Sequence, residues 1–438
     1  MNQLLTIHTP SPEELLEGFM ETCQRYRDQP MDDDDESDGM MCAKSIVNQI
    51  FGNYLYRYPK WTFAKAMDEL QIEDLSTDAE ATFFALCEVF YRQFTQPAKE
   101  EDFSGLARVA FITGIRELVD RGLVISVAIH NNEKSMSSTD AYLISKPAAR
   151  LLFGGIDKLL SPSVLSQFGT FVYREGIEGK TLSFPPELQQ SVDKIVTITS
   201  TGKYETLVKN LQANGLRDGL TMLFYGPPGT GKTEFARQLA KKTGRDLFIV
   251  DSAKVGGTYF GEEPRQIRNL FRAFSYCCAV SIRVPILLFD EADSILCRRM
   301  TVVNASDKEA NSVANIILEE MNAFSGILIA TTNNLQTLDP AMFRRFLIKL
   351  EFSAPDTKTR AAIWKTKLPW LSTASALKLA EHGALSGGLI DNVVSLCIIE
   401  KSLIGKNPTL SFILHLLEGQ EVGAERPRPK IGFQSNVK

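Results

Sequence analysis

The sequence lacks the features that would place the chain in a membrane. No uninterrupted apolar run approaches the ~18–20 residues of a transmembrane helix. The opening residues, Met1, Asn2 and Gln3, carry no basic stretch ahead of an apolar one, so no secretory signal is expected. These absences predict a cytoplasmic chain with no membrane partner.

Cysteine and histidine are too scattered to suggest a metal site or a disulfide framework. The seven cysteines show no Cys-x-x-Cys spacing, and the four histidines form no metal-ligand pattern. The His-Glu-x-x-His motif of zinc proteases is also absent. We therefore expect reduced, buried thiols of a cytoplasmic protein.

Positive charge is scarce in the first third of the chain. Residues 1–150 carry 14 Lys and Arg against 25 Asp and Glu, a net charge of −11, whereas the remainder nets +6. Because phosphate contacts need basic side chains, nonspecific nucleic-acid binding is not expected of this part. The acidic run 31–39 predicts that segment 1–42 is largely disordered, with a short amphipathic helix around Pro12–Arg27. An acidic docking role for the run is the alternative.

The pattern from residue 43 to residue 156 is helical and then briefly β. A helix is predicted over 108–121, two strands over 123–127 and 141–144, and a further helix from residue 146. This order resembles a winged helix-turn-helix domain. The candidate recognition helix 108–121 is nearly neutral, so protein docking or a structural role is favoured, and DNA binding stays the alternative. Residues 157–204 are expected to form a connector.

A strand, a glycine-rich loop and a helix follow one another from residue 220 to residue 242. The glycines let the loop curl so that its N–H groups point at a phosphate, and the helix N-terminus adds partial positive charge. Lys232 can reach the β- and γ-phosphates, and the Thr233 hydroxyl can ligate Mg²⁺. The pattern predicts an ATP site at Gly226, Pro227, Pro228, Gly229, Thr230, Gly231, Lys232, Thr233 and Glu234.

An apolar strand over 285–289 ends in acidic residues. A continuous apolar run is typical of a central parallel strand. Asp290 is placed to hold Mg²⁺ through water, and Glu291 is the natural base to polarise an attacking water. The alternative is that Glu291 is only a solvated acid after a strand.

Polar residues also follow the strand predicted over 326–332. Asn333 could orient the lytic water or contact the γ-phosphate. Further along, Arg344 and Arg345 precede a fifth strand over 347–352. The two arginines could pair with local acids, or they could stabilise the charge at a neighbouring subunit's ATP.

The motifs GPPGTGKT, LLFDEAD, ATTNN and LDPAMFRRF, in this order, resemble the AAA branch of the AAA+ ATPases. The resemblance covers about residues 205–420. It implies an α/β fold in which a five-stranded parallel P-loop domain (205–354) is followed by a helical lid (355–422) and a tail (423–438). The tail is similar to those of uncharacterised prokaryotic members.

The same resemblance implies roles for the motif residues. It implies Mg²⁺-dependent ATP hydrolysis, with Asp290 and Glu291 as the acidic pair, Asn333 as sensor and Arg344 and Arg345 as arginine fingers in a homo-oligomeric, hexameric ring. Gly387 lies in a lid motif whose glycines approach the nucleotide. Two departures stand out: no arginine occurs between Arg360 and Arg426 to act as a lid sensor, and no glycine separates the two fingers, which favours Arg345.

A glycine-flanked aromatic loop lies between the second strand and the next helix. Tyr259, Phe260 and Gly261 resemble the AAA pore loop that grips an extended polypeptide. Core packing of Phe260 is the alternative. The leading hypothesis is a ring-forming ATPase that remodels a protein client. The alternatives are a DNA-associated regulator anchored by the winged helix and a nucleotide-gated scaffold with low turnover.

Overall fold

The computed structural model describes the chain over residues 10–29, 42–93, 97–130, 138–154, 165–255, 263–294, 305–383 and 385–421. The chain divides into two compact units. Unit 1 comprises residues 1–171 and 251–285, and unit 2 comprises residues 172–250 and 286–438. The predicted domain boundaries follow the order of the motifs instead, and they stay a prediction.

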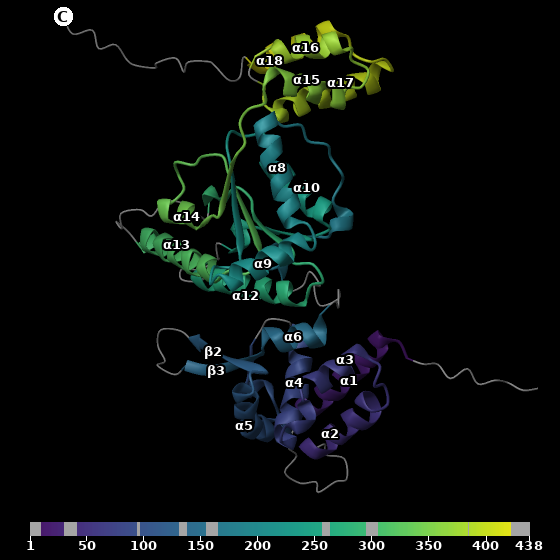
Figure 1. The fold of residues 1–438 in the computed structure, drawn as a ribbon, viewed down its shortest axis with the longest axis vertical. Helices are drawn as coiled ribbons and strands as arrows, with labels where there is room; N and C mark the ends of the chain where they lie inside the picture. Colours follow the sequence, from purple (N-terminus) through teal and green to yellow (C-terminus); the bar gives the residue numbers. More distant parts are fainter. Residues whose placement is uncertain are drawn as a thin grey trace, which may run out of the picture. The chain divides into compact units, whose positions relative to one another are not determined.

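Unit 1 is mainly helical with one small sheet (Figure 1). Its α-helices are α1 (Pro12–Arg27), α2 (Ala43–Ile50), α3 (Thr62–Glu69), α4 (Thr77–Gln93), α5 (Gly105–Asp120), α6 (Lys146–Phe153), α11 (Ser252–Val255) and α12 (Glu263–Val280). Short π or 3₁₀ turns are η1 (Phe51–Leu55), η2 (Ile72–Asp74) and η3 (Glu100–Asp102). The strands β1 (Ala98–Lys99), β3 (Ser138–Ile144) and β2 (Val124–His130) pair antiparallel in that order.

Helix α1 is an ordered part of the unit 1 core. The Ser11 side chain accepts from the Glu14 amide while the Glu14 side chain accepts from the Ser11 amide, a capping box that fixes the start of the helix. Phe19 and Cys23 are fully buried. The predicted helix at Pro12–Arg27 is thus present, and the expectation that the rest of segment 1–42 is largely disordered stays a prediction. The acidic run 31–39 lies outside the described residues.

Helices α4 and α5 pack closely, and the β2–β3 hairpin follows them. Gly114 of α5 lies so close to the backbone of Asp78 and Ala79 at the start of α4 that a Cβ there would come within 2.6 Å of the Ala79 amide nitrogen. The helix predicted over 108–121 therefore corresponds to α5, and the two predicted strands correspond to the hairpin. That this arrangement is a winged helix stays a prediction.

Helix α12, although distant in sequence, completes the unit 1 core. The hydroxyl of Tyr276 donates to the carbonyl of Ile144 at 2.7 Å. Its ring centroid lies 5.6 Å from that of Phe90, which stacks on Phe153 of α6 at 5.0 Å. All three rings are buried. Residues 251–285 are thus held by the N-terminal part of the chain.

Unit 2 is built on a parallel sheet. Its strands are β5 (Leu220–Tyr225), β6 (Leu247–Val250), β7 (Ile286–Phe289), β8 (Ile327–Thr332) and β9 (Ile348–Glu351). The order in the sheet is β4-β6-β7-β8-β5-β9, where β4 (Gly169–Val172) lies in sequence at the boundary between the two units. The pairs β6–β7, β7–β8, β8–β5 and β5–β9 are parallel. The predicted five parallel strands are confirmed, and β4 adds a sixth that the sequence did not predict.

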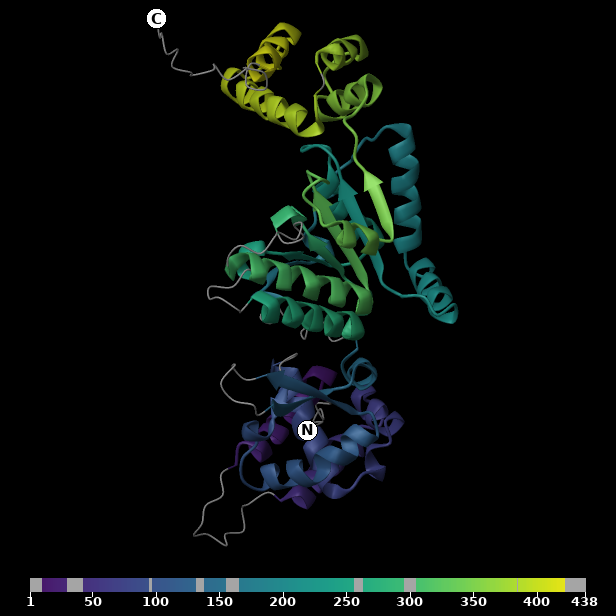
Figure 2. The same cartoon turned by 90° about the vertical axis from the view of Figure 1, so that its left-hand side faces the viewer.

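Helices pack around the sheet of unit 2. They are α8 (Pro186–Thr199), α9 (Lys203–Ala213), α10 (Lys232–Thr243), α13 (Ala305–Ala323) and α14 (Pro340–Arg345). Figure 2 shows α8 beside the edge strand β9, and α8 also contacts α10. Residues 157–204, expected to be a connector, therefore include a packed helix and the strand β4.

Four helices form the lid: α15 (Thr357–Lys367), α16 (Thr373–Glu381), α17 (Gly387–Ile404) and α18 (Leu410–Glu421). Trp364, Leu379 and Ile390 are fully buried in a core of the lid's own. The predicted helical lid is confirmed. Among the helices that the structure describes, none combines the length and apolar character needed to cross a membrane.

Candidate nucleotide site

The loop between β5 and α10 has the left-handed backbone that its glycines permit. The φ angles are 142° at Gly226, 74° at Gly229 and 96° at Gly231. A side chain at Gly226 would also clash, since its Cβ would lie 2.2 Å from the carbonyl oxygen of Phe352. These angles favour glycine strongly, so the sequence fixes the curl of the loop.

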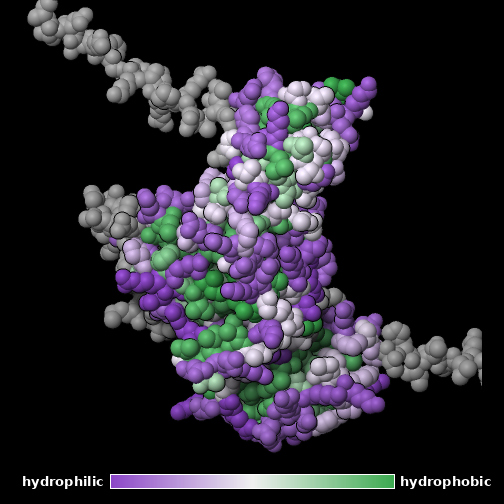
Figure 3. All heavy atoms as spheres, turned by 45° about the horizontal axis from the view of Figure 1, so that its top comes forward, coloured by the Kyte–Doolittle hydropathy of each residue, from purple (hydrophilic) through white to green (hydrophobic). Residues whose placement is uncertain are grey.

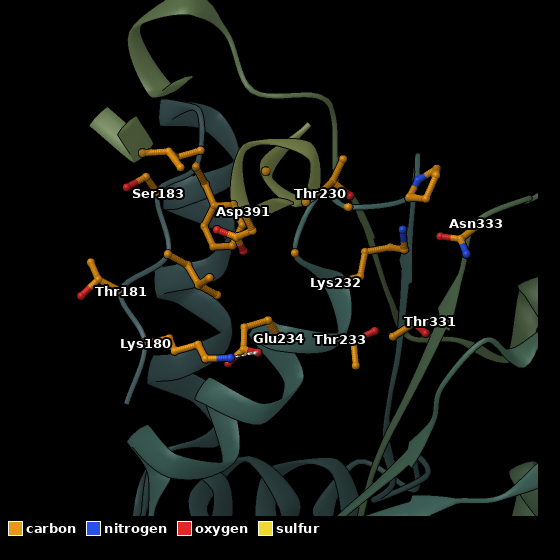
Figure 4. Close-up of a pocket in the computed structure, with 18 of the residues that line it drawn as sticks. Lys180, Thr181, Ser183, Thr230, Lys232, Thr233, Glu234, Thr331, Asn333 and Asp391 are labelled. Atoms are coloured by element: carbon orange, nitrogen blue, oxygen red, sulfur yellow. Dashed lines mark hydrogen bonds and ion pairs between the residues drawn. The ribbon is translucent and has the colours of Figure 1, made fainter. Parts of the chain in front are cut away.

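The loop forms one wall of a cavity of about 400 Å³, a volume within the usual range of ligand pockets (Figure 4). Predicted site residues that line it are Pro228, Gly229, Thr230, Gly231, Lys232, Thr233, Glu234, Glu291, Asn333 and Gly387. Residues that the sequence did not predict also line it: Lys180, Thr181, Leu182, Ser183, Phe184, Thr331, Ile363, Lys367, Gly388 and Asp391.

Lys232 is 5% exposed and is held by the loop itself. Its Nζ donates to the carbonyls of Gly226 and Pro227, both at 2.8 Å. Burial lowers the pKa of the ammonium group, while the carboxylates of Asp290 and Asp293 act in the opposite direction. The cation is thus positioned over the curled loop, where a phosphate would bind.

Two threonine hydroxyls meet on one carboxylate oxygen. Thr233 at the start of α10 and Thr331 in β8 each donate to Oδ1 of Asp290 at 2.6 Å. The Thr331 hydroxyl also accepts from the Glu291 amide at 3.0 Å. Asp290 itself does not line the cavity, but it is hydrogen-bonded to Thr233 and Thr331, which do.

The third acid of the LLFDEAD motif holds the loop that carries Asn333. Asp293 accepts from the Thr332 hydroxyl, from the Asn333 amide at 3.3 Å and from the Thr337 hydroxyl at 3.2 Å. Asn333 lies at the edge of the cavity (Figure 4). The sequence identified Asn333 but assigned no role to Asp293, although the motif contained it.

The lid contacts the glycine-rich loop directly. The Gly388 amide donates to the carbonyl of Gly229 at 2.9 Å. A Cβ on Gly387 would lie 3.1 Å from the same carbonyl oxygen. The lid glycines therefore lie beside the glycine-rich loop, where the neighbour of Gly387 makes the direct contact, and their approach to a nucleotide stays a prediction.

Two charged pairs in the cavity wall include residues that the sequence did not predict. Lys180 bonds to Glu234 at 3.2 Å, shown by a dashed line in Figure 4. In the lid, Lys367 bonds to Asp391 at 2.9 Å. Glu234 was predicted with the loop motif, whereas Lys180, Lys367 and Asp391 were not, because they reach the cavity only when the lid and the segment before α8 fold against the loop.

The two predicted arginine fingers lie outside this cavity. Both are in α14, where Arg344 is exposed and Arg345 is half-buried. The carbonyl of Arg345 accepts from the Thr221 hydroxyl of β5 at 2.8 Å. The structure therefore does not bring either arginine to this chain's own site. The predicted pore-loop residues Tyr259, Phe260 and Gly261 lie outside the described residues.

Comparison with known proteins fits the geometry of the loop, the acidic pair and the parallel sheet. Residues 222–354 match the family model "ATPase family associated with various cellular activities (AAA)". The chain contains an AAA ATPase domain. ATP hydrolysis is the reaction of this enzyme family, and the matched range of the AAA domain runs from β5 past β9.

Relatives of the AAA domain are found among proteasome subunits. The 26S proteasome regulatory subunit 6B homolog of Saccharomyces cerevisiae is 34% identical over 178 residues, which cover 39% of each chain. That of Encephalitozoon cuniculi is 33% identical over 150 residues, which cover 33% of this chain and 37% of the relative. The chain thus spans about two fifths of the length of these relatives. A solved structure titled "Structure of E. coli MS115-1 HORMA:CdnC:Trip13 complex" is 17% identical, with a TM-score of 0.46, and covers 58% of this chain and 96% of the other.

Proposed function

We propose that the protein is a cytoplasmic, Mg²⁺-dependent AAA ATPase that assembles into a homo-oligomeric ring and uses ATP to remodel a protein client. The observation that carries this proposal is the meeting of Thr233, Asp290 and Glu291 beside the curled loop and Lys232. Each further element of the proposal has its own support.

The donor set fits Mg²⁺. A threonine hydroxyl and a carboxylate are oxygen donors, which this cation prefers. Among the described residues, no cluster of three or more His, Cys, Asp or Glu side chains could hold a metal alone. Mg²⁺ typically takes one or two protein ligands and completes its shell with phosphates and water. Thr233 and Asp290 would hold it, and bound Mg²⁺ would neutralise charge on the phosphates.

Hydrolysis requires a base and donors around the phosphates. Lys232 and the amides of the curled loop would bind the β- and γ-phosphates. Glu291 lines the cavity and would accept a proton from the attacking water, while Asn333 would orient that water. Glu234 and Gly387 would complete the walls.

The positions of the two predicted arginine fingers support the proposal of a ring. Arg344 is exposed on α14 and neither arginine lines the cavity, so the Arg344 cation could reach a neighbour's nucleotide, whereas Arg345 is half-buried. The lid helix α17 also exposes apolar side chains, Leu396 at 38%, Ile399 at 56% and Leu403 at 77%. They follow one face of the helix, and Figure 3 shows hydrophobic side chains at the lid surface. We propose that a second copy covers this face in the ring.

The features of α5 favour a protein over DNA as the partner of unit 1. The segment 108–121 carries three arginines, Arg108, Arg116 and Arg121. Two of them are engaged: Arg108 pairs with Glu100 at 2.6 Å, and Arg121 donates to the carbonyl of Asp74 at 2.7 Å. Between them the helix exposes Val109 and Ile112, at 49% and 56%. An apolar face with few unpaired cations is poorly suited to phosphates.

The decisive experiment compares ATP turnover of the native protein and Glu291→Gln. We expect the variant to bind ATP normally while turnover falls by about 100-fold or more, because the base is lost but phosphate binding is not. Equal turnover in the two proteins would leave the nucleotide-gated scaffold as the better proposal.

Client remodelling is tested separately. Proteins that co-purify with Glu291→Gln in ATP are identified and then offered to native protein and to a Tyr259→Ala, Phe260→Ala variant. We expect the double variant to lose substrate-stimulated turnover and keep basal turnover. Unchanged stimulation excludes threading by this loop, and binding of duplex DNA by the protein at low salt would favour the regulator instead.

A further inference from the structure

The turn after β7 contains a strained residue. Glu291 has φ of 49°, and it is one of two described non-glycine residues with positive φ. A left-handed backbone at such a residue costs about 1–2 kcal/mol, so surrounding contacts must hold it. The residue that carries this strain lines the cavity together with the glycine-rich loop and Lys232.

One hydroxyl in the neighbouring strand holds this turn on both sides. Thr331 is 2% exposed in β8. Its hydroxyl donates a hydrogen bond to Asp290 Oδ1 at 2.6 Å and accepts one from the Glu291 amide at 3.0 Å. A hydroxyl can donate and accept at the same time, and no apolar side chain of the same shape can replace both bonds.

The bond to Asp290 also ties the turn to the nucleotide loop. Since Thr233 donates to the same oxygen at 2.6 Å, Thr331 and Thr233 together fix the carboxylate. The adjacent Thr332 serves a different acid, because its hydroxyl donates to Asp293. Two successive threonines of β8 thus hold two separate acids of the motif.

We propose that Thr331 is a positioning residue for hydrolysis: its hydroxyl holds the left-handed backbone of Glu291 and, through it, the direction of the carboxylate. The inference rests on the proposed role of Glu291 in ATP hydrolysis. It assigns to Thr331 an effect on the chemical step and not on nucleotide binding, because the residue holds the acidic turn while the loop and Lys232 bind the phosphates.

The test compares Thr331→Val, Thr331→Ser and a matched control. Thr331→Val keeps the β-branched shape and removes both bonds, whereas Thr331→Ser keeps the hydroxyl. Thr243→Val is the control, since Thr243 is buried at the end of α10 and its hydroxyl donates to the carbonyl of Leu239 at 2.7 Å. Turnover is measured at saturating ATP and Mg²⁺, and ATP affinity is measured by calorimetry.

We expect kcat of Thr331→Val to fall by about 10- to 100-fold, the usual effect of losing such an outer partner. Its ATP affinity should stay within about threefold of native, and Thr331→Ser should recover most of the turnover. The proposal is overturned if Thr331→Val matches Thr243→Val, if Thr331→Ser is equally impaired, if ATP binding is lost, or if excess Mg²⁺ restores kcat.

Glu291→Gln is measured alongside to separate the two proposals. If Glu291→Gln loses turnover and Thr331→Val does not, only the inference about Thr331 fails. If Glu291→Gln keeps native turnover, the proposed hydrolytic role of Glu291 fails, and the inference fails with it.

Discussion

At the scale of single residues, Gly229 is where the nucleotide loop meets the lid. It combines a φ of 74° with the bond between its carbonyl and the Gly388 amide. A Cβ at this position would come within 2.7 Å of the Ser386 hydroxyl and 3.2 Å of the Gly388 nitrogen. A substitution there would therefore affect the backbone and the lid together.

We predict that Gly229→Ala weakens ATP binding by at least about tenfold. The added Cβ would displace the loop backbone and the lid from the positions in which they bind the phosphates, and a tenfold loss corresponds to about 1.4 kcal/mol of binding free energy. Gly215→Ala is the matched control, because Gly215 has a φ of 66° and nothing within 4 Å of its Cβ position. Calorimetric titration of both variants with ATP checks the prediction, and equal affinities would contradict it.

A second residue-scale prediction concerns Glu80, a carboxyl buried in unit 1. Burial, followed by the nearby charges of Glu73 and Glu117, raises its pKa to about 7. Because the folded pKa lies above that of the unfolded chain, this group's stabilisation is complete below about pH 4.5 and is lost as the pH rises through 7.

Between pH 5 and pH 8 the native protein should therefore lose more stability than Glu80→Gln, by at most about 3 kcal/mol. Thermal melting of both proteins at the two pH values provides the measurement. Glu69→Gln, which changes an exposed carboxyl of α3, is the control and should follow the native protein. A native-like pH dependence in Glu80→Gln would show that another group is responsible.

At the scale of elements, the close contact between α4 and α5 depends on a glycine, Gly114, at the point where the helices meet. A Cβ on Gly114 would lie 2.6 Å from the backbone of both Asp78 and Ala79. Backbone cannot move aside as a flexible side chain does, so the helices would have to separate.

We predict that Gly114→Ala destabilises the protein by about 1–3 kcal/mol through this overpacking. Gly52→Ala in η1 is the control, since nothing lies within 4 Å of its Cβ position, and it should be neutral or stabilising by up to about 1 kcal/mol. Urea unfolding of the two variants distinguishes them. A stable Gly114→Ala would mean that α5 can shift along α4 without loss.

The elements that the sequence predicted are those with a local cause. The glycine-rich loop, the apolar strands β5, β7 and β8, and α1 each follow from spacing, caps or apolar runs inside the segment itself. Lys180 had no such mark, and Thr331, although inside the ATTNN motif, was assigned no role, because their contacts join segments far apart in sequence. The sixth strand was missed because it pairs with a strand distant in sequence. Helix α8 does carry a local signal that the prediction overlooked, with Pro186 at its start and Leu188, Val192 and Ile195 at helical spacing.

At the scale of the whole molecule, unit 1 includes a segment that the sequence assigned to the ATPase domain. Tyr276 of α12 is bonded to Ile144 and packed against Phe90. We predict that a protein lacking residues 1–171 exposes this face of α12, binds a hydrophobic dye and aggregates, unlike the full chain. Size-exclusion chromatography and dye fluorescence test this. A monodisperse fragment with native turnover would show that α12 does not need these partners.

The position of α12 also has a consequence for synthesis. A chain leaves the ribosome from its N-terminus, at about 5–20 residues per second. Residues 1–171 emerge first, yet their core remains open until Tyr276 follows, after the glycine-rich loop and β6 of unit 2 have already appeared. The N-terminal region therefore cannot complete its core before the nucleotide loop of unit 2 has been made.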